Sequence, residues 1–435
     1  MKFASTRGGS PAVALSQAIV QGIAPDGGLY VPASWPAIPP GAVANDTALL
    51  PVGLRALAPF LDGDALAPEL GAILSEAFNF PVPLTELTGA PGTAAVLELF
   101  HGPTAAFKDF GARFLAACMV RQRQAATRPL TILVATSGDT GGAAAAAFHA
   151  RPGIEVVVLF PRGLVSKRQQ QQLTCWDGNV RAVVVRGTFD DCQRLVKEAF
   201  RDPALAKTHD LSSANSINIG RLLPQAVYYA ASSLEIGRRH GRPASYIVPA
   251  GNLGNALACV WARRLGFPID EILLAHNANR TVPDFLVSGE YRPRPGIATL
   301  ASAMDVGDPS NFERLRNLEP DWSRLAADVR AYSVSDAEIR EQIRRDYARY
   351  GRIWCPHTAT AARVYDLLTE ERRRGKIWVL VATAHPAKFD EIVEPLIGRA
   401  IEVPPALARL LALPSRSTEI GATGDDLRNL LTRDR

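Results

Sequence analysis

The sequence predicts an α/β protein built on two open, mostly parallel β-sheets. Short runs rich in β-forming residues recur from residue 94 onward, and segments of helical length and composition separate them. The runs are apolar on both faces, as strands buried inside a parallel sheet are. No motif repeats with a period of about 20 to 50 residues, which argues against a repeat architecture. The expected strands cover residues 94–100, 130–135, 154–160, 180–185, 245–250, 271–275 and 376–382.

Two flanking segments and one helix complete the predicted outline. Residues 1–90 mix short apolar runs with many prolines, so we expect an accessory segment of helices and turns. Within it, Asp26-Gly27-Gly28 predicts a turn that leads into an extended piece. Ser335 and Glu338 have the spacing of a capping box, which predicts the start of an amphipathic helix. Residues 401–435 are expected to form a short, helix-prone tail.

Length and composition narrow the possible functions. With 435 residues, of which 47% are hydrophobic, the chain can bury a large core in two or three domains. No run reaches the roughly 18 apolar residues of a membrane span, and the first residues lack a secretory signal, so we expect a cytoplasmic protein without a membrane partner. The five cysteines include no C-x-x-C pair. The net charge of +5 is dispersed, which disfavours nucleic acid and is compatible with an anionic substrate.

Two glycine-containing loops follow predicted strands and are candidate anion sites. Ligands of parallel sheets bind beyond the carboxyl ends of the strands. Each loop opens a helix, where free backbone N–H groups and the helix dipole favour a phosphate or a carboxylate. Taken alone, a helix cap or a glycine turn is an equally good or better explanation of each loop. The candidate residues are Ser137, Asp139 and Thr140 in the first loop and Gly251, Asn252, Leu253, Gly254 and Asn255 in the second.

Two further loops carry polar candidates. Asn215, Ser216, Asn218 and Arg221 lie close together at the start of a helix, and an arginine can grip a phosphate through two hydrogen bonds. The alternative for this cluster is capping plus a surface arginine. Thr383, at the end of a predicted strand, could offer its hydroxyl to a ring nitrogen. The histidines 101, 357 and 385 stand on separate loops without metal-ligand spacing, so we expect no metal site, and we expect histidine 385 to be a helix cap.

Lys108 is the candidate nucleophile. It stands between Phe107 and the pair Asp109-Phe110, and these aromatic neighbours can withhold water from its amine. Desolvation disfavours the ammonium form and lowers the pKa, as a Schiff-base lysine requires. A surface lysine paired with Asp109 is the alternative. Only seven of the 48 basic residues are lysines, so a lysine among apolar residues is less easily explained as surface filler.

Six motifs, in order along the chain, resemble the signature set of threonine synthases. These are pyridoxal-phosphate enzymes of the tryptophan-synthase β fold type, also called fold type II. The resemblance extends from about residue 21 to beyond residue 390. The motifs are HGPTAAFKDFGARF (101–114), ATSGDTGGAAAAAF (135–148), NSINIGRLLPQ (215–225), VPAGNLGNA (248–256), AMDVGDPSNFERL (303–315) and TAHPAKF (383–389).

The resemblance implies an activity and a domain plan. The activity is conversion of O-phospho-L-homoserine and water to L-threonine and phosphate, the last step of threonine biosynthesis, with pyridoxal 5'-phosphate as cofactor. A large cofactor-binding domain would comprise residues 91–128 and 226–400, and a small α/β domain residues 129–225. No oligomeric state is implied.

The resemblance also implies residue roles. Lys108 corresponds to the lysine that binds the cofactor covalently, the loop 251–255 to the cofactor-phosphate site, and Thr383 to the partner of the pyridine nitrogen. Ser137, Asp139 and Thr140 correspond to the loop near the substrate carboxylate and the cofactor ring, and Asn215, Ser216, Asn218 and Arg221 to the substrate-phosphate site. The sequence departs from the usual family pattern at Ala250, Leu253 and Asn255, where serine, phenylalanine and aspartate are frequent.

Two other functions stay open at this point. Another pyridoxal-phosphate lyase on the same fold, such as a phospholyase or an ammonia-lyase, would share most of these motifs. A second anion site is needed only for a phosphorylated substrate, so residues 215–221 favour threonine synthase over an ammonia-lyase. A binding or regulatory protein that keeps the fold without catalysis is the alternative outside the enzymes, and the intact Lys108 argues against it.

Overall fold

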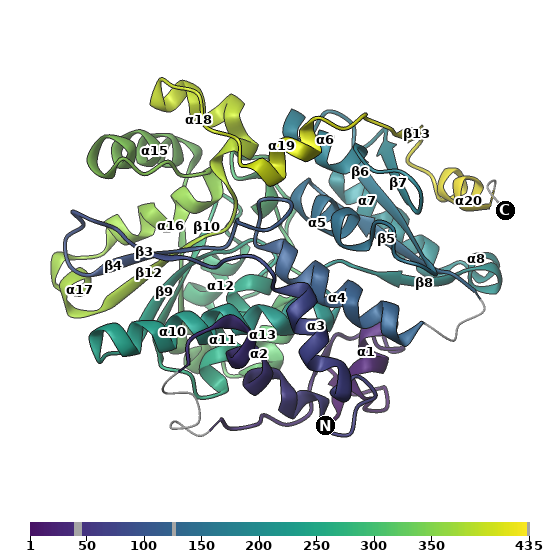
Figure 1. Ribbon diagram of the computed structural model, residues 1–435, viewed down its shortest axis with the longest axis horizontal. Coiled ribbons are helices and arrows are strands. Elements are labelled where there is room, and N and C mark those ends of the chain that lie inside the picture. Colours follow the sequence, from purple (N-terminus) through teal and green to yellow (C-terminus); the bar gives the residue numbers. More distant parts are fainter. Residues whose placement is uncertain (39–45, 124–127, 433–435) are drawn as a thin grey trace.

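A computed structural model describes residues 1–38, 46–123 and 128–432 of the chain. Two β-sheets with helices on both faces form the two halves of the molecule, side by side in Figure 1. Neighbouring strands in these sheets run parallel, except that β3 (Leu84–Glu86) is antiparallel at one edge, so the predicted α/β class is confirmed. Within the described ranges, no helix combines the length and the apolar character that a membrane crossing requires.

The larger sheet has six strands. In sheet order they are β11 (Val329–Ser333), β10 (Ile269–His276), β9 (Ala244–Pro249), β12 (Ile377–Ala382), β4 (Ala94–Glu98) and β3. Side chains of β12 alternate between two cores, as expected of a strand buried on both faces. Val379 and Val381 join the core that contains α10 (Ala226–His240) and α11 (Gly254–Arg264). Trp378 and Leu380 join the core that contains α15 (Asp336–Tyr350) and α16 (Pro356–Leu367).

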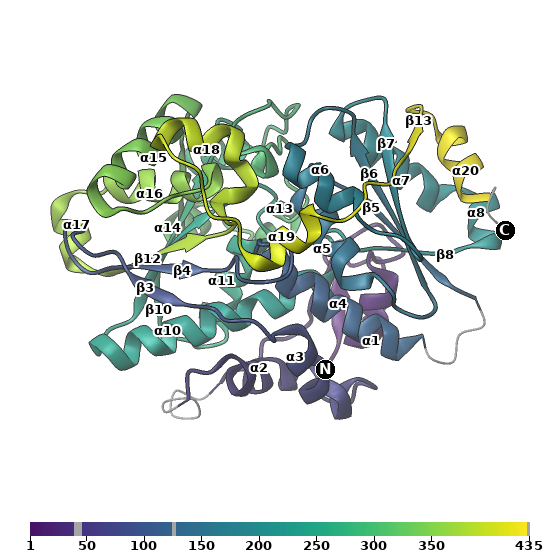
Figure 2. The same ribbon diagram turned by 45° about the horizontal axis from the view of Figure 1, so that its top comes forward.

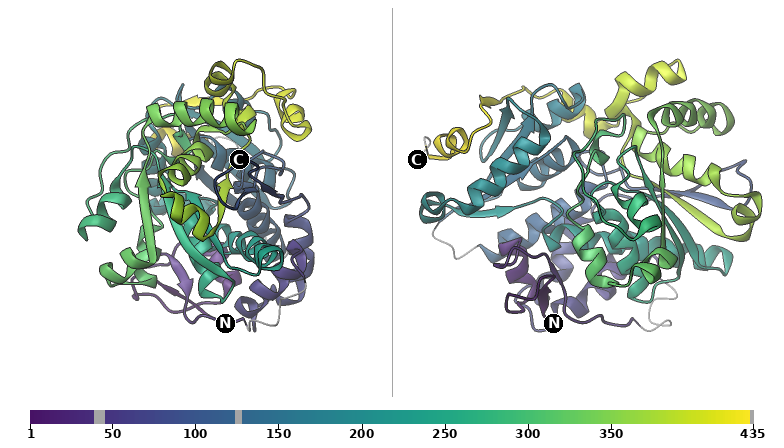
Figure 3. Two further views of the ribbon diagram at one scale, coloured as in Figure 1. Left: turned by 90° about the vertical axis from the view of Figure 1, so that its left-hand side faces the viewer. Right: turned by 180° about the vertical axis from the view of Figure 1, so that it is seen from behind.

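The smaller sheet has five parallel strands. In sheet order they are β13 (Thr418–Ile420), β7 (Val180–Val185), β6 (Ile154–Pro161), β5 (Leu130–Ala135) and β8 (Asp210–Ser213). Leu133 of β5 packs in the core shared with α7 (Phe189–Arg201) and α20 (Gly424–Thr432). Its neighbours Ile132 and Val134 point to the opposite core, shared with α4 (Lys108–Gln122) and α5 (Asp139–Phe148). The views in Figure 3 show this sheet from two further sides.

The N-terminal segment packs beneath the junction of the two halves, as Figure 1 shows. It contains the antiparallel pair β1 (Phe3–Ser5) and β2 (Tyr30–Pro32) and the helices α1 (Leu15–Gln21), α2 (Leu49–Leu57) and α3 (Leu70–Ala77). The predicted turn is confirmed: Gly27 has φ +80°, and the Gly28 N–H donates to Asp26 Oδ1 at 2.9 Å. The chain then enters β2, the expected extended piece.

The C-terminal segment runs from the larger sheet to the smaller one, as Figure 2 shows in yellow. It includes α18 (Asp390–Ile397), α19 (Pro405–Leu411), β13 and α20. The helix-prone character predicted for this tail is confirmed, but the strand β13, which pairs with β7, was not predicted. With three residues at a sheet edge, β13 is too short to show a periodic pattern.

All seven predicted strands are present, and the predicted capping box is confirmed. Ser335 Oγ accepts a hydrogen bond from the Glu338 N–H (3.4 Å), and Glu338 Oε2 accepts one from the Ser335 N–H (2.9 Å) at the start of α15. The remaining helices are α6 (Lys167–Thr174), α8 (Pro203–Thr208), α9 (Ile219–Leu222), α12 (Thr281–Ser288), α13 (Phe312–Leu318), α14 (Trp322–Asp328) and α17 (Glu370–Gly375).

Candidate active site

A cavity lies between the two sheets, where the loops after β5, β9 and β12 meet the start of α4. It brings together candidates that lie far apart in the sequence. Of the predicted site residues, only Asn218 is absent from its lining. Those that line it are Lys108, Ser137, Asp139, Thr140, Asn215, Ser216, Arg221, Gly251, Asn252, Leu253, Gly254, Asn255 and Thr383.

Lys108 is the first residue of α4, and contacts with the end of β12 fix its position. The Phe107 N–H donates to the Thr383 carbonyl (2.8 Å), and the His385 N–H donates to the Ala105 carbonyl (3.0 Å). Ala105 has φ +55°, a left-handed conformation that an alanine adopts only at an energetic cost. The start of α4 is therefore tied to the loop after β12, with the lysine beside that loop.

The Lys108 amine makes no hydrogen bond or ion pair with a described residue, and it lies 5.6 Å from the centre of the Phe107 ring. Burial lowers its pKa to about 8; the nearby cations Lys388 and Arg221 act in the same direction, and the Asp139 carboxylate opposes them. An amine with this pKa is partly neutral near physiological pH. It can then act as a nucleophile or a base.

Asp109 is not the partner of Lys108. Its carboxylate is buried and accepts hydrogen bonds from the Thr104 N–H (2.9 Å) and the Thr104 hydroxyl (2.6 Å). A Cβ added to Gly102 would lie 2.5 Å from Asp109 Oδ2, so this close packing depends on the glycine. The alternative interpretation of Lys108 as a surface lysine paired with Asp109 is therefore wrong.

The loop between β9 and α11 approaches the facing backbone closely. A Cβ on Gly251 would lie 2.6 Å from the Cα of Met304, which only a glycine avoids. Leu253, immediately before α11, has a left-handed backbone with φ +62°, and its side chain is buried in the core. The first N–H groups of α11 have no partner within the helix, as at any helix start. The loop thus offers backbone donors to the cavity.

Two asparagine side chains in this loop also keep polar atoms without a partner. Asn255 Oδ1 accepts hydrogen bonds from the hydroxyls of Tyr228 (2.6 Å) and Tyr229 (2.8 Å), which leaves its buried Nδ2 as an unused donor. Asn252 Nδ2 donates to Ser216 Oγ (2.8 Å), and its buried Oδ1 accepts no hydrogen bond from a described residue. Unpaired buried polar groups destabilise the folded protein, so these two atoms indicate that the loop 251–255 binds a ligand that supplies their hydrogen bonds.

Thr383 follows β12 directly and is held through its backbone. Its N–H donates to Thr358 Oγ1 (3.3 Å) and its carbonyl accepts from Phe107, while its hydroxyl makes no hydrogen bond within the described part of the chain. The neighbouring His385 accepts the Ala387 N–H on Nδ1 (3.2 Å), so the expected helix cap is confirmed.

The loop after β5 is held by its own threonine. Thr136 Oγ1 accepts hydrogen bonds from the N–H groups of Gly138 and Gly141, both at 2.9 Å. Asp139, the first residue of α5, is buried, and its Oδ1 is engaged by Lys388 Nζ (2.7 Å) and Gln169 Nε2 (2.9 Å). Both contacts are made to Oδ1, so Lys388 and Gln169 fix the position of this carboxylate beside the cavity.

The loop before α9 contributes one buried cation and a structural cap. Arg221 is buried, its guanidinium donates to the Ala214 carbonyl, and its Nε makes no hydrogen bond with a described residue. Burial lowers the pKa of Arg221 to about 10, which leaves it charged at neutral pH. Asn218 instead caps α9 through the Gly220 N–H (2.9 Å) and donates to the Ile19 carbonyl (2.9 Å). The geometry therefore gives no support to the predicted substrate contact by Asn218.

Arg314 in α13 was not singled out from the sequence. It is buried, forms no ion pair with a described residue, and donates to the carbonyls of Tyr30 (3.0 Å), Ser216 (3.1 Å) and Ile217 (2.6 Å). It also donates to Asn311, whose amide holds the Asn252 carbonyl (3.0 Å). Arg314 thus connects β2, the loop before α9 and the loop before α11. Its place in the motif NFERL was the available sequence signal.

Family models match nearly the whole chain. Residues 78–384 match the model of pyridoxal-phosphate dependent enzymes. Residues 2–78 match the threonine synthase N terminus, and residues 358–430 the threonine synthase C-terminal region. More distant solved structures, such as maize serine racemase with 15% identity and a TM-score of 0.53, share the fold alone.

Relatives of the same type align over their full length. The curated threonine synthase of Serratia marcescens is 37% identical over 433 residues, which cover 99% of this chain and 99% of the relative. The crystal structure of threonine synthase from Escherichia coli superposes with a TM-score of 0.88 at 35% identity and covers 100% of both chains. The structure of pyridoxal-phosphate-bound threonine synthase from Brucella melitensis gives a TM-score of 0.90 at 34% identity, with 99% and 98% covered. The chain therefore belongs to the threonine synthases within the pyridoxal-phosphate-dependent enzymes.

Proposed function

We propose that this chain converts O-phospho-L-homoserine and water to L-threonine and phosphate. The reaction is the one implied by the names of its relatives, and the cavity between the two sheets is its site. The substrate carries an amine, a carboxylate and a phosphate. The cavity must therefore hold an amino acid at one end and a second anion at the other.

The residues present fit pyridoxal phosphate. Lys108 would bind its aldehyde carbon through the unpaired, partly neutral amine. The loop 251–255 would bind its phosphate, using the backbone of α11's first turn and the unused Asn255 Nδ2. Thr383 would offer its free hydroxyl to the ring nitrogen. When bound, the cofactor supplies an electron sink that stabilises negative charge on substrate carbons.

The chain's own groups would bind the substrate and move its protons. The Lys108 Nζ would be the base that takes the proton from the substrate Cα. Arg221, with Ser216 and Asn215 on the same loop, would hold the substrate phosphate before and after it leaves Cγ. Ser137 and Thr140, at the start of α5, would bind the substrate carboxylate.

The observation that carries this proposal is a buried cation, Arg221, in the lining of the same cavity. Arg221 is buried and charged, has a free Nε, and forms no ion pair with a described residue. A buried, unpaired guanidinium is costly unless a ligand neutralises it. An ammonia-lyase of unphosphorylated amino acids would have no use for it.

The test is an assay of phosphate release from O-phospho-L-homoserine, with the organic product identified by chromatography. We expect one L-threonine for each phosphate. Phosphate released together with a keto acid would instead identify a phospholyase. If the purified protein shows no absorbance band that borohydride abolishes, the chain is a non-catalytic relative.

We also propose that the protein works in the cytoplasm, where biosynthetic enzymes and their phosphorylated intermediates are found. Fractionation of the native cells, followed by the same phosphate-release assay, tests this location. Activity recovered mainly in a membrane or secreted fraction would contradict it.

A further inference from the structure

Lys388 is a second lysine beside the cavity, and it is completely buried. It lies in the short 3-10 helix η5 (Pro386–Phe389) that follows β12. Its Nζ is 2.7 Å from Asp139 Oδ1 and donates to the Thr104 carbonyl at 2.8 Å. Gln169 Nε2 donates to the same carboxylate oxygen at 2.9 Å. Lys388 and Gln169 therefore hold Asp139 from outside the cavity, since neither belongs to its lining, whereas Asp139 does.

Asp139 and Lys108 line the same cavity, so the carboxylate is a possible counter-ion for the catalytic amine. A carboxylate that paired with Lys108 would stabilise the ammonium form, which is neither a nucleophile nor a base. We propose that Lys388 is a positioning residue: it binds the Asp139 carboxylate so that Asp139 keeps its place at the start of α5 without becoming the counter-ion of Lys108. The inference rests on the role of Lys108 in the proposed function.

The charged groups around Lys108 shift the pKa of its amine in opposite directions. Asp139 on α5 raises the pKa of Lys108, whereas Lys388 in η5 and Arg221 on α9 lower it. His357 on α16 also faces this group, but burial lowers its pKa to about 4, so it is neutral. Within α4 itself, Asp109 is occupied by Thr104. Lys388 and Asp139 therefore carry opposite charges that shift the pKa of Lys108 in opposite directions. Removing either charge would leave the other to act on Lys108 alone.

Lys167 provides a matched control for this pair. Its Nζ also lies 2.7 Å from a carboxylate, Glu391 Oε1, but its side chain is 88% exposed, whereas that of Lys388 is 0% exposed. Water screens the first pair and not the second. The same substitution at the two lysines therefore separates an effect of buried charge from a general effect of removing a lysine.

The experiment measures the Lys108 amine directly. Full-length protein freed of cofactor is treated with an amine-acetylating reagent at a series of pH values, and modification of the Lys108 peptide is followed by mass spectrometry. The midpoint of the rate against pH gives the apparent pKa of Lys108. For Lys388→Met we expect this midpoint to rise by about one unit or more, because an opposite charge that is no longer masked shifts a pKa by that amount. For Lys167→Met and Lys388→Arg we expect the wild-type midpoint.

The double variant Lys388→Met/Asp139→Asn removes both charges and should return the midpoint to near the wild-type value. An unchanged or lower midpoint in Lys388→Met would overturn the proposal. If Lys388→Met does not fold, the comparison of Asp139→Asn with the double variant decides the question. In Asp139→Asn the Lys388 cation has lost its carboxylate partner, so the midpoint should be lower than in the double variant. Equal midpoints would overturn the proposal. Because the readout is acetylation of one amine, the result does not depend on which substrate the enzyme turns over.

Discussion

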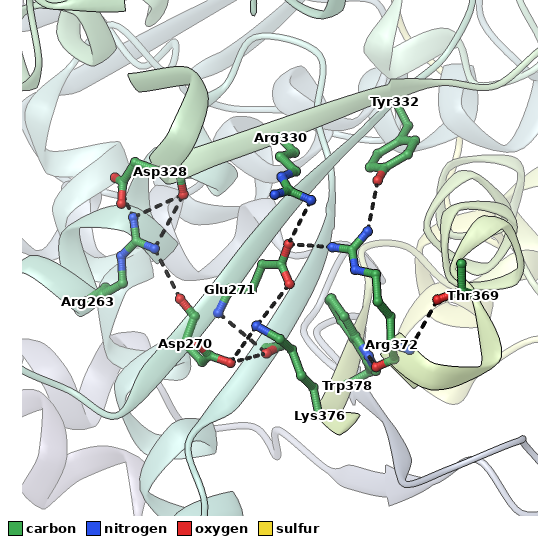
Figure 4. Close-up of polar contacts among 11 residues, drawn as sticks. Arg263, Asp270, Glu271, Asp328, Arg330, Tyr332, Thr369, Arg372, Lys376 and Trp378 are labelled. Atoms are coloured by element: carbon green, nitrogen blue, oxygen red, sulfur yellow. Dashed lines mark hydrogen bonds and ion pairs between the residues drawn. The ribbon is translucent and has the colours of Figure 1, made fainter. Parts of the chain in front are cut away.

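The two ends of the six-stranded sheet differ in how their cations are partnered. At the amino ends of β10, β11 and β12, cations and anions are paired repeatedly, as Figure 4 shows. Glu271 contacts Arg372 (2.5 Å) through Oε1 and Lys376 (3.1 Å) through Oε2, and Asp270 contacts the same lysine at 2.9 Å. At the carboxyl ends, Lys388 is paired with Asp139, but Arg221 and Arg314 are buried and form no ion pair with a described residue.

This difference in pairing distinguishes charges that stabilise the fold from charges that are available to bind a ligand. In the amino-end network, each partly exposed cation has a carboxylate partner, so removing one group leaves its neighbours hydrated or paired with another. In the cavity, the charge of Asp109 only partly offsets the desolvation of Arg221, and no described carboxylate forms an ion pair with it, so a bound anion has a large effect there. This comparison predicts large functional effects at one end of the sheet and small stability effects at the other.

Substitution of Lys108 tests the cavity end most strongly. Arginine at this position stays charged at any accessible pH and cannot bind the aldehyde, so Lys108→Arg should lose activity by about a thousandfold or more. The visible absorbance of the bound cofactor should change at the same time. Steady-state assays and an absorption spectrum check both. Lys376→Arg, in the amino-end network, is the control and should keep nearly full activity; equal losses in the two variants would contradict the comparison.

Arg314 is expected to affect stability more than any residue of the amino-end network. Arg314→Met leaves the carbonyls of Tyr30, Ser216 and Ile217 without their donor, at a cost of about 3 kcal/mol in the free energy of unfolding. Urea denaturation of the cofactor-free protein measures this loss. Because Arg314 also holds the cofactor loop through Asn311, cofactor affinity should fall with it. A stable variant with normal cofactor affinity would show that these bonds are dispensable.

Arg221 should affect substrate binding rather than stability. Loss of a charge-assisted hydrogen bond to an anion costs about 2 kcal/mol, so Arg221→Met should lower kcat/KM by about 30-fold while the cofactor spectrum stays unchanged. Arg221→Lys keeps the charge but not the planar fork, so its kcat/KM should lie between those of the wild type and Arg221→Met. Arg263→Met, which removes a 2.5 Å pair with Asp328 at the amino end, is the matched control. Kinetics with varied phosphohomoserine distinguish the three variants.

The sequence predicted the fold well where strands are long, apolar and central. β8 and β11 were missed because DLSS and VRAYS contain too few consecutive apolar residues to show a buried-strand pattern, and β13 has only three residues. Their positions are set by pairing with neighbouring strands, which is tertiary information. Hence the central strands of each sheet were predictable and several edge strands were not.

The site was predictable at the level of loops and less so at the level of side chains. The rule that ligands bind beyond strand ends selected loops that the structure brings together around one cavity. Asn218 shows the limit, because a capping asparagine and a ligand-binding asparagine look alike in sequence. Lys388 shows the converse: the scarcity of lysine that drew attention to Lys108 applied to it equally, but its burial against Asp139 depends on packing between the two halves.

The smallest expected effect lies in the amino-end network. Lys376 bridges Asp270 and Glu271, and its side chain is 31% exposed, so Lys376→Met should reduce the free energy of unfolding by less than about 1 kcal/mol. Most of this difference should disappear at high salt, because salt screens partly exposed charges. Urea denaturation at low and at 1 M salt measures both values, and kcat/KM should not change. A loss of stability as large as that of Arg314→Met, and unaffected by salt, would contradict this expectation. Paired charges at the amino end would then contribute as much stability as the buried Arg314, and the contrast between the two ends of the sheet would fail.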